Sequence, residues 1–228
     1  PLILGTNSIK DTGYNVANSL RFNDGSSDYL SRTPTTENIN KITFSCWVKR
    51  GTLGSTQRIF SNPSTEYLFH RFESNDTFRF TIVVDGSETT IRTNRVFRDT
   101  SAWYHILVNW DTTQSVESNR IRLWINGVQE TSFNLSTYPA LNSNSDMFNS
   151  STAFEIGRYS VGNSEFFDGY MAELVVADGQ SLLPLDFGIE DEDTGIWKPI
   201  DVSGLTFGTN GFYLDFENSG SLGADVSG

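Results

Sequence analysis

Short apolar stretches with a period of two residues, separated by tight turns, limit most strongly what this chain can fold into. In residues 78–84, Phe78, Phe80 and Ile82 would face one side of a strand, and Arg79 and Thr81 the other. The same alternation recurs in residues 20–22, 43–49, 105–110, 121–125, 172–176 and 212–216. Because no window shows a helical period, we expect an all-β fold.

Two-residue turns join several of these stretches. Asn126 and Gly127 give the strongest hairpin signal, because a type I′ turn needs positive φ at both central residues. Asp85 and Gly86 lie between two other predicted strands in the same way. Many short strands with frequent turns predict two antiparallel sheets packed as a sandwich.

Composition allows a large core and excludes several classes of partner. The 228 residues are 37% apolar and include 17 Phe, whereas the net charge is −12 and the pI about 4.5. This charge argues against nucleic acids as partners and against docking on anionic membranes. The sequence contains no apolar stretch of 18 residues, so no transmembrane helix is expected. The single cysteine, Cys46, permits no internal disulfide, which points to a bacterial, viral or intracellular origin.

The chain divides into three parts on these patterns. Residues 1–18 are expected to form an N-terminal arm or edge strand, and residues 19–180 the sandwich. Residues 181–228 form a C-terminal extension with one further strand, which either closes the sandwich or leads into a domain that this chain does not contain. The Asn- and Ser-rich residues 134–152 and the acidic residues 181–198 are expected to be loops, with a short helical turn near 182–187.

Several segments in a fixed order resemble the concanavalin A-like lectin and laminin G superfamily. They read SLRF at 19–22, TFSCWVK at 43–49, IFS at 59–61, WYHILV at 103–108, RLWINGV at 122–128, FEIG at 154–157 and FDGYMAEL at 167–174. This resemblance implies an all-β, two-sheet antiparallel jelly-roll sandwich. It also implies glycan binding or a calcium ion at one rim.

A narrower resemblance joins most of the chain to virion proteins of tailed phages of marine bacteria. It rests on residues 21–32, 103–113, 166–179, 194–199 and 208–216. It implies a non-enzymatic virion surface protein, either decorating the capsid or associated with tail fibres, that serves particle stability or host attachment. The expected partners are other virion proteins, host surface glycans and further copies of the chain. The protein would be made in the host cytoplasm and carried on the particle surface.

Aromatic and acidic side chains supply the candidate binding residues. Sugar rings stack on exposed aromatic rings, and the candidates are Trp47, Trp124, Tyr138 and Tyr159. Hard cations bind clustered oxygen ligands, and the calcium candidates are Asp24, Asp28, Asp111 and Asp168, with Glu173 as a further oxygen. No local calcium-loop signature fixes them. Strand aromatics are also common core residues, so burial is the alternative for the tryptophans.

Catalytic chemistry finds little support in the sequence. No strand carries the paired carboxylates that a glycoside hydrolase of this fold places on one face, and the run Glu190 to Asp193 lacks strand-forming neighbours. That run is expected to be a solvated loop, with a calcium loop as its alternative. His70 is expected at an exposed strand position and His105 in the core. The alternatives to a virion protein are therefore a calcium-dependent lectin module and, more remotely, a glycoside hydrolase or lyase.

Overall fold

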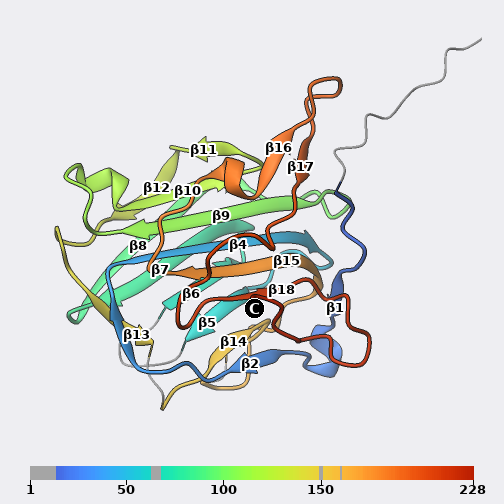
Figure 1. The fold of residues 1–228 in the computed structure, drawn as a ribbon, viewed down its shortest axis with the longest axis horizontal. Helices are drawn as coiled ribbons and strands as arrows, with labels where there is room; N and C mark the ends of the chain where they lie inside the picture. The colour runs from blue at the N-terminus through green and yellow to red at the C-terminus, as the bar shows by residue number, and fades with distance from the viewer. Residues whose placement is uncertain (1–13, 63–67, 149–150, 160) are drawn as a thin grey trace, which may run out of the picture.

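Two seven-stranded antiparallel sheets face each other across the core (Figure 1). The computed structural model describes residues 14–62, 68–148, 151–159 and 161–228. These residues confirm the all-β jelly-roll sandwich. Most of the predicted N-terminal arm, residues 1–13, lies outside the described residues.

Sheet A contains β1 (Leu20–Phe22), β15 (Gly169–Asp178), β4 (Lys41–Arg50), β9 (Tyr104–Asp111), β10 (Ile121–Ile125) and β11 (Val128–Glu130) in spatial order, with β18 (Phe212–Leu214) also paired to β15. Sheet B contains β12 (Phe133–Thr137), β8 (Ser87–Val96), β7 (Thr77–Val84), β6 (Leu68–Phe72), β5 (Gln57–Asn62), β14 (Phe154–Ile156) and β2 (Leu30–Arg32). Two small ribbons pair β13 (Ser145–Phe148) with β3 (Glu37–Ile39), and β16 (Gly188–Glu190) with β17 (Trp197–Pro199). The short 3-10 turns are η1 (Asp24–Ser26), η2 (Glu117–Asn119) and η3 (Pro184–Asp186).

Both strong hairpin predictions are confirmed. Asn126 and Gly127 have φ of 50° and 77° between β10 and β11. Asp85 and Gly86 have φ of 50° and 71° between β7 and β8. These are the left-handed conformations that a primed turn requires, so the turn residues fix the register of both hairpins.

The main core lies between the sheets and consists largely of aromatic rings. Phe72, Phe78 and Phe80 are fully buried in sheet B, and Trp110 is buried opposite them in sheet A. His70 belongs to this core, so its prediction as an exposed residue is wrong. Strand alternation places it beside Phe72 on the inner face, where its ring lies 5.0 Å from that of Phe80.

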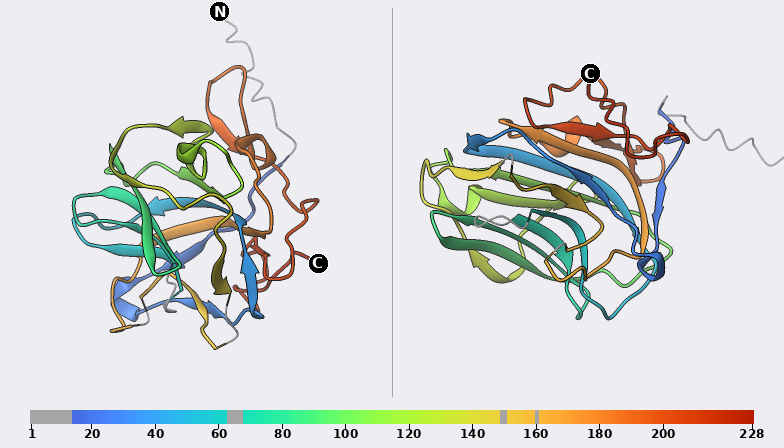
Figure 2. Two further views of the ribbon diagram at one scale, coloured as in Figure 1. Left: turned by 90° about the vertical axis from the view of Figure 1, so that its left-hand side faces the viewer. Right: turned by 90° about the horizontal axis from the view of Figure 1, so that it is seen from below.

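A second apolar layer covers the outer face of sheet A. Leu107, Trp124 and Val175 of the sheet pack against Phe187 and Phe207 of the C-terminal extension. Figure 2 shows this extension lying over sheet A on the side away from sheet B. Neither apolar cluster of the described chain covers the outer face of sheet B in this way.

The C-terminal extension is also tied to sheet A by hydrogen bonds. β18 pairs with β15, and the Tyr213 hydroxyl donates to the Glu173 carboxylate at 2.5 Å. Glu173 sits at a bulge in β15 with a φ of 49°, and the Tyr14 hydroxyl also donates to it, at 2.8 Å. Burial raises the pKa of Glu173, and the two hydrogen bonds offset part of that rise.

The two predicted loops contain more structure than expected. Residues 134–152 include most of β12 and all of β13, and residues 181–198 include η3, β16 and part of β17. β12 is an edge strand of five residues, and its alternation of Phe133 and Leu135 with exposed polar side chains is too short to stand out in the Asn- and Ser-rich sequence that follows. The predicted helical turn near 182–187 is confirmed as η3. No helix in the described chain is long and apolar enough to cross a membrane.

Candidate binding face

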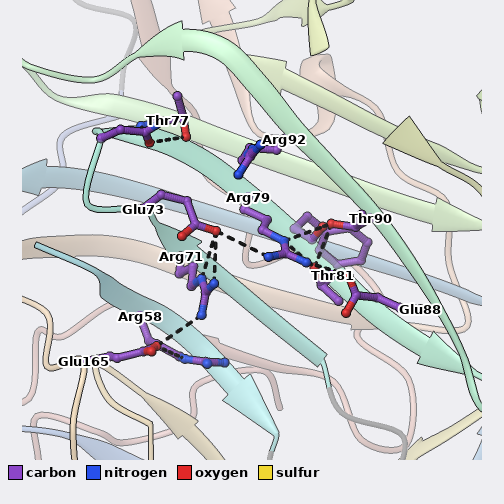
Figure 3. A network of polar contacts seen from close by, with 12 residues as sticks. Arg58, Arg71, Glu73, Thr77, Arg79, Thr81, Glu88, Thr90, Arg92 and Glu165 are labelled. Carbon is purple, nitrogen blue, oxygen red and sulfur yellow. Dashed lines mark hydrogen bonds and ion pairs between the residues drawn. The ribbon is translucent and has the colours of Figure 1, made fainter. Parts of the chain in front are cut away.

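Four arginines lie in a row across the outer face of sheet B (Figure 3). Arg58 of β5 pairs with Arg71 of β6, Arg71 pairs with Arg79 of β7, and Arg79 pairs with Arg92 of β8. All four project away from the core, because the alternate residues of these strands fill the space between the sheets. We call the row, together with Phe69 between its side chains, the arginine face.

Three glutamates link the arginines into a network. Glu165 contacts Arg58 at 2.5 Å and Arg71 at 3.5 Å. Glu73 contacts Arg71 at 3.1 Å and Arg79 at 3.7 Å. Glu88 accepts a hydrogen bond of 2.5 Å from Arg79.

Arg92 has a different partner from the rest of the row. Its Nε donates to the amide oxygen of Asn134 on β12 at 2.6 Å. In Figure 3 no dashed contact joins Arg92 to the other residues drawn. The row therefore ends, on the β8 side, in a guanidinium group held by a neutral acceptor.

Aromatic rings support the guanidinium groups. The ring of Phe69 lies 4.4 Å from the guanidinium carbon of Arg58 and 4.5 Å from that of Arg71, with Arg79 at 5.3 Å. Tyr159 covers Arg58 at 4.1 Å. These cation–π contacts hold the planar groups in fixed orientations. The side chains of Arg71 and Arg79 are 16% and 17% exposed, so each is partly withdrawn from water.

Burial affects the electrostatics most strongly at Arg58. It lowers the pKa of the Arg58 guanidinium, and the hydrogen bond and charge of Glu165 offset part of the change. A partly buried guanidinium group remains charged at ordinary pH, so the arginine face carries fixed positive charges.

The polar surface continues onto the next strands of sheet B. Glu155 of β14 accepts two hydrogen bonds from Arg158, at 2.8 and 3.0 Å. The guanidinium carbon of Arg158 lies 3.3 Å from the ring centre of Tyr29, which is 42% exposed. Tyr159 therefore places an aromatic ring against the arginine row, whereas Tyr29 lies farther along the sheet, against Arg158.

The predicted glycan-binding aromatics lie in three different places. Trp47 and Trp124 are on the outer face of sheet A and are buried, where Trp47 stacks on His105 with ring centres 5.0 Å apart. Tyr138 packs against the main core and is half-buried. Of the four, Tyr159 alone lies at the arginine face.

The predicted calcium ligands lie in three sets of contacts, with Asp24 and Asp28 in one turn and Asp111 and Asp168 each in another setting. Asp24 begins the exposed turn η1, and Asp28 accepts a hydrogen bond from the backbone of Asn23 at 3.0 Å. Asp111 is buried and accepts hydrogen bonds from Thr113 at 2.6 Å and Gln114 at 2.7 Å.

Asp168 serves a third, separate set of contacts. It accepts hydrogen bonds of 2.5 Å from both Arg21 and Thr52, which hold the pKa of its carboxyl group below the ordinary value although burial acts to raise it. Among the described residues no group of three or more His, Cys, Asp or Glu side chains could hold a metal ion.

The acidic run forms the turn between β16 and β17. Asp191 is buried and accepts hydrogen bonds from Lys198 at 2.5 Å and Thr194 at 2.8 Å. Lys198 and Thr194 hold the pKa of Asp191 well below its usual range. This carboxylate therefore stabilises the hairpin.

A pocket of about 310 Å³ lies on the other side of the molecule, beside sheet A. Trp47, Trp103 and Pro199 line it, together with residues 16–19 and Ala172. Its lining consists mainly of apolar side chains. None of the residues that line this pocket is charged, in contrast to the arginine face.

The arginine row was missed at the level of sequence. Alternation places Arg79 on the outer face, but the sequence of one strand does not reveal which residues lie opposite it. The available signal was one arginine at an outward position in each of several neighbouring strands.

Comparison with known proteins gives a family and several structural neighbours. A family profile described as the concanavalin A-like lectin/glucanases superfamily matches residues 24–181. No curated protein has a significantly similar sequence.

The structural neighbours are distant in sequence. A proposed carbohydrate binding protein from Bacteroides ovatus ATCC 8483 superposes with a TM-score of 0.56 and 14% identity, over 88% of this chain and 52% of that one. Tailspike protein 2 of an Escherichia coli O157:H7 bacteriophage gives a TM-score of 0.51 and 15% identity, over 72% of this chain and 23% of that one. A heptameric SAP-like pentraxin from Limulus polyphemus gives 0.46 and 16%, over 68% and 70%. The chain thus spans about half of the Bacteroides protein and about a quarter of the tailspike.

Proposed function

Because the chain belongs to the concanavalin A-like lectin/glucanases superfamily, we propose that it is a carbohydrate-binding module that acts without catalysis. Its ligand would lie on the arginine face. The observation that carries this proposal is the row Arg58, Arg71, Arg79 and Arg92 on a sheet face that the described C-terminal extension leaves open.

The chemistry of this face suits a sugar ligand. Guanidinium and carboxylate groups in fixed orientations offer paired donors and acceptors to ring hydroxyl groups. Tyr159 adds an aromatic ring at its border, where a sugar ring can stack, and Tyr29 adds another farther along the same sheet. Because the network holds these side chains in place, binding costs little side-chain entropy.

Binding without cleavage is consistent with how the acidic groups are used. A glycosidase needs two carboxyl groups free to act on the glycosidic bond. Glu73, Glu88 and Glu165 are each engaged by arginines of the row.

We further propose that the module is carried on the surface of a tailed-phage particle, for host attachment or particle stability. The tailspike among the structural neighbours supports this placement, as does the acidic chain, with 28 acidic and 16 basic residues. An immunoblot of purified particles of the phage that encodes the chain tests it. A chain found only in the infected-cell lysate, and not in the particles, would contradict it.

A glycan-array screen tests the binding function directly. The purified chain is screened beside two variants, Arg71→Gln in the row and Arg95→Gln at the exposed end of β8, after equal thermal stability has been checked. Binding that R71Q loses and R95Q keeps supports the proposal. The absence of binding to any glycan, or equal loss in both variants, counts against it.

A further inference from the structure

The arginine row is costly for the fold alone. Like charges that lie directly opposite each other on neighbouring strands destabilise a sheet. Here the arrangement occurs three times in succession, from Arg58 to Arg71, from Arg71 to Arg79, and from Arg79 to Arg92. The three glutamates offset this repulsion from within the protein.

The glutamates do not fully balance the row. Four guanidinium groups share Glu73, Glu88 and Glu165, while Arg92 meets the neutral amide of Asn134. Two of the carboxylates, those of Glu73 and Glu165, each serve two arginines. The row therefore has one more positive charge than its carboxylates neutralise.

Resting on the proposed carbohydrate-binding function, we infer that the ligand is a linear acidic polysaccharide whose carboxylate or sulfate groups lie along the arginine row. The ligand's anions pair with Arg92 and share the guanidinium groups now bridged by Glu73 and Glu165. Neighbouring strands are about 4.8 Å apart, so the row spans about 14 Å, enough for several sugar units.

The surroundings of the row favour a polysaccharide over other polyanions. The net charge of −12 repels an anionic chain elsewhere on the molecule, which confines binding to this one face. A sugar chain can lie across the row and stack on Tyr159 at its edge. Stacked nucleic acid bases would instead need several exposed rings along the binding path.

Calorimetric titration with three probes tests the inference. The probes are polygalacturonate, which carries carboxylates, dextran sulfate, which carries sulfates, and neutral dextran. The chain is expected to bind at least one of the two acidic polymers and to bind neutral dextran at least about tenfold more weakly.

Two substitutions separate the row from general electrostatics. Arg92→Gln removes the guanidinium group that has no carboxylate partner among the described residues, and should weaken acidic-polymer binding at least about fivefold. The control, Arg95→Gln, removes the same charge three residues away. It should change the affinity for the acidic polymer less than twofold. Glu73→Gln removes an internal competitor and should tighten binding. Thermal unfolding confirms that each variant is folded.

The outcomes distinguish this inference from the proposed function. If the chain binds neutral dextran, or a neutral glycan on the array, as tightly as the acidic polymers, the acidic class of ligand is overturned. The carbohydrate-binding function then still stands. Equal losses in R92Q and R95Q overturn the role of the row. Single-stranded DNA is titrated as a control beside the three probes. If it binds as tightly as the acidic polymers, with the same response to R92Q, it overturns the polysaccharide in favour of polyanions in general. If no glycan binds at all, the proposed function fails first.

Discussion

Trp197 donates a hydrogen bond of 3.0 Å from its indole nitrogen to Nδ1 of His105. An indole N–H can only donate, so Nδ1 accepts and the proton of the neutral imidazole is on Nε2, which then donates to the Ser45 hydroxyl at 2.8 Å. The His105 ring stacks on that of Trp47, with ring centres 5.0 Å apart, and its Nδ1 edge faces Trp197. One histidine thus joins the C-terminal hairpin to sheet A, about 90 residues away in sequence.

Gly127 and Gly188 leave the space that the Trp197 ring occupies, and Gly127 offers a matched test. A Cβ on Gly127 would lie 2.6 Å from the Trp197 ring, whereas a Cβ on Gly86, in the equivalent turn of the other hairpin, would meet nothing within 4 Å. Gly86→Ala should cost about 1 kcal/mol of unfolding free energy, from its positive φ alone. Gly127→Ala should cost about 1–2 kcal/mol more, because it also displaces Trp197. Urea unfolding of both variants measures the difference, and equal losses would contradict the packing role of Trp197.

The buried ion pair between Arg50 and Asp76 predicts a large effect of one substitution. The Arg50 side chain is 0% exposed, stacks on Phe72 at 4.4 Å and contacts Asp76 at 3.0 Å. Asp76→Ala should destabilise the fold by about 3–5 kcal/mol, because it leaves a buried guanidinium group without its counter-ion. The exposed Arg98 contacts the same carboxylate at 2.9 Å, and Arg98→Ala should cost less than about 1 kcal/mol. Chemical denaturation of both variants measures these losses of unfolding free energy. A loss that is small in both variants would contradict the prediction.

The two buried histidines predict a loss of stability in weak acid. Burial lowers the pKa of both His70 and His105 to about 3, against an ordinary value of 6.5. The unfolded chain therefore binds more protons below pH 6.5, and stability falls as the pH drops from 6.5 towards 3. Between pH 7.5 and pH 5.0 each histidine should cost about 2 kcal/mol.

His70→Leu isolates one of these contributions. The loss between pH 7.5 and pH 5.0, measured by urea unfolding, should be smaller by about 2 kcal/mol in the variant than in the parent chain. Asp178, whose pKa burial raises to about 6, acts in the opposite direction but is common to both proteins and cancels. If the variant and the parent chain lose the same unfolding free energy between pH 7.5 and pH 5.0, His70 is not held neutral.

Calcium removal should leave the stability unchanged. Asp111 and Asp168 have their oxygens engaged by protein donors, and among the described residues no three acidic, histidine or cysteine side chains form a metal-binding group. We expect the same midpoint of thermal unfolding in millimolar calcium and in excess chelator. A midpoint several degrees higher with calcium would show a bound ion and favour the alternative of a calcium-dependent lectin.

The sequence predicts the sandwich well because each strand carries its own evidence. Alternation in residues 78–84 and the turn at Asn126 and Gly127 are local patterns, and the structure follows both. What covers each sheet is not local. Trp124 shares its face of the strand with Arg122, yet it is buried by residues of the extension beyond position 180. The arginine row depends on the register between four strands, which no single strand encodes.

Phe69 and Phe80 provide a final pair of variants, because they lie on opposite faces of sheet B. Phe80 is fully buried in the core, and Phe69 lies beneath the guanidinium groups of Arg58 and Arg71 on the outer face. Phe80→Leu should cost about 1–2 kcal/mol of stability through the cavity it leaves, with glycan binding retained. Phe69→Leu should cost about 1 kcal/mol and weaken glycan binding several-fold, because the arginines lose the ring that orients them. Denaturation and titration on both variants separate the two roles, and binding that survives in F69L but fails in F80L would show that the arginine face is not the ligand site.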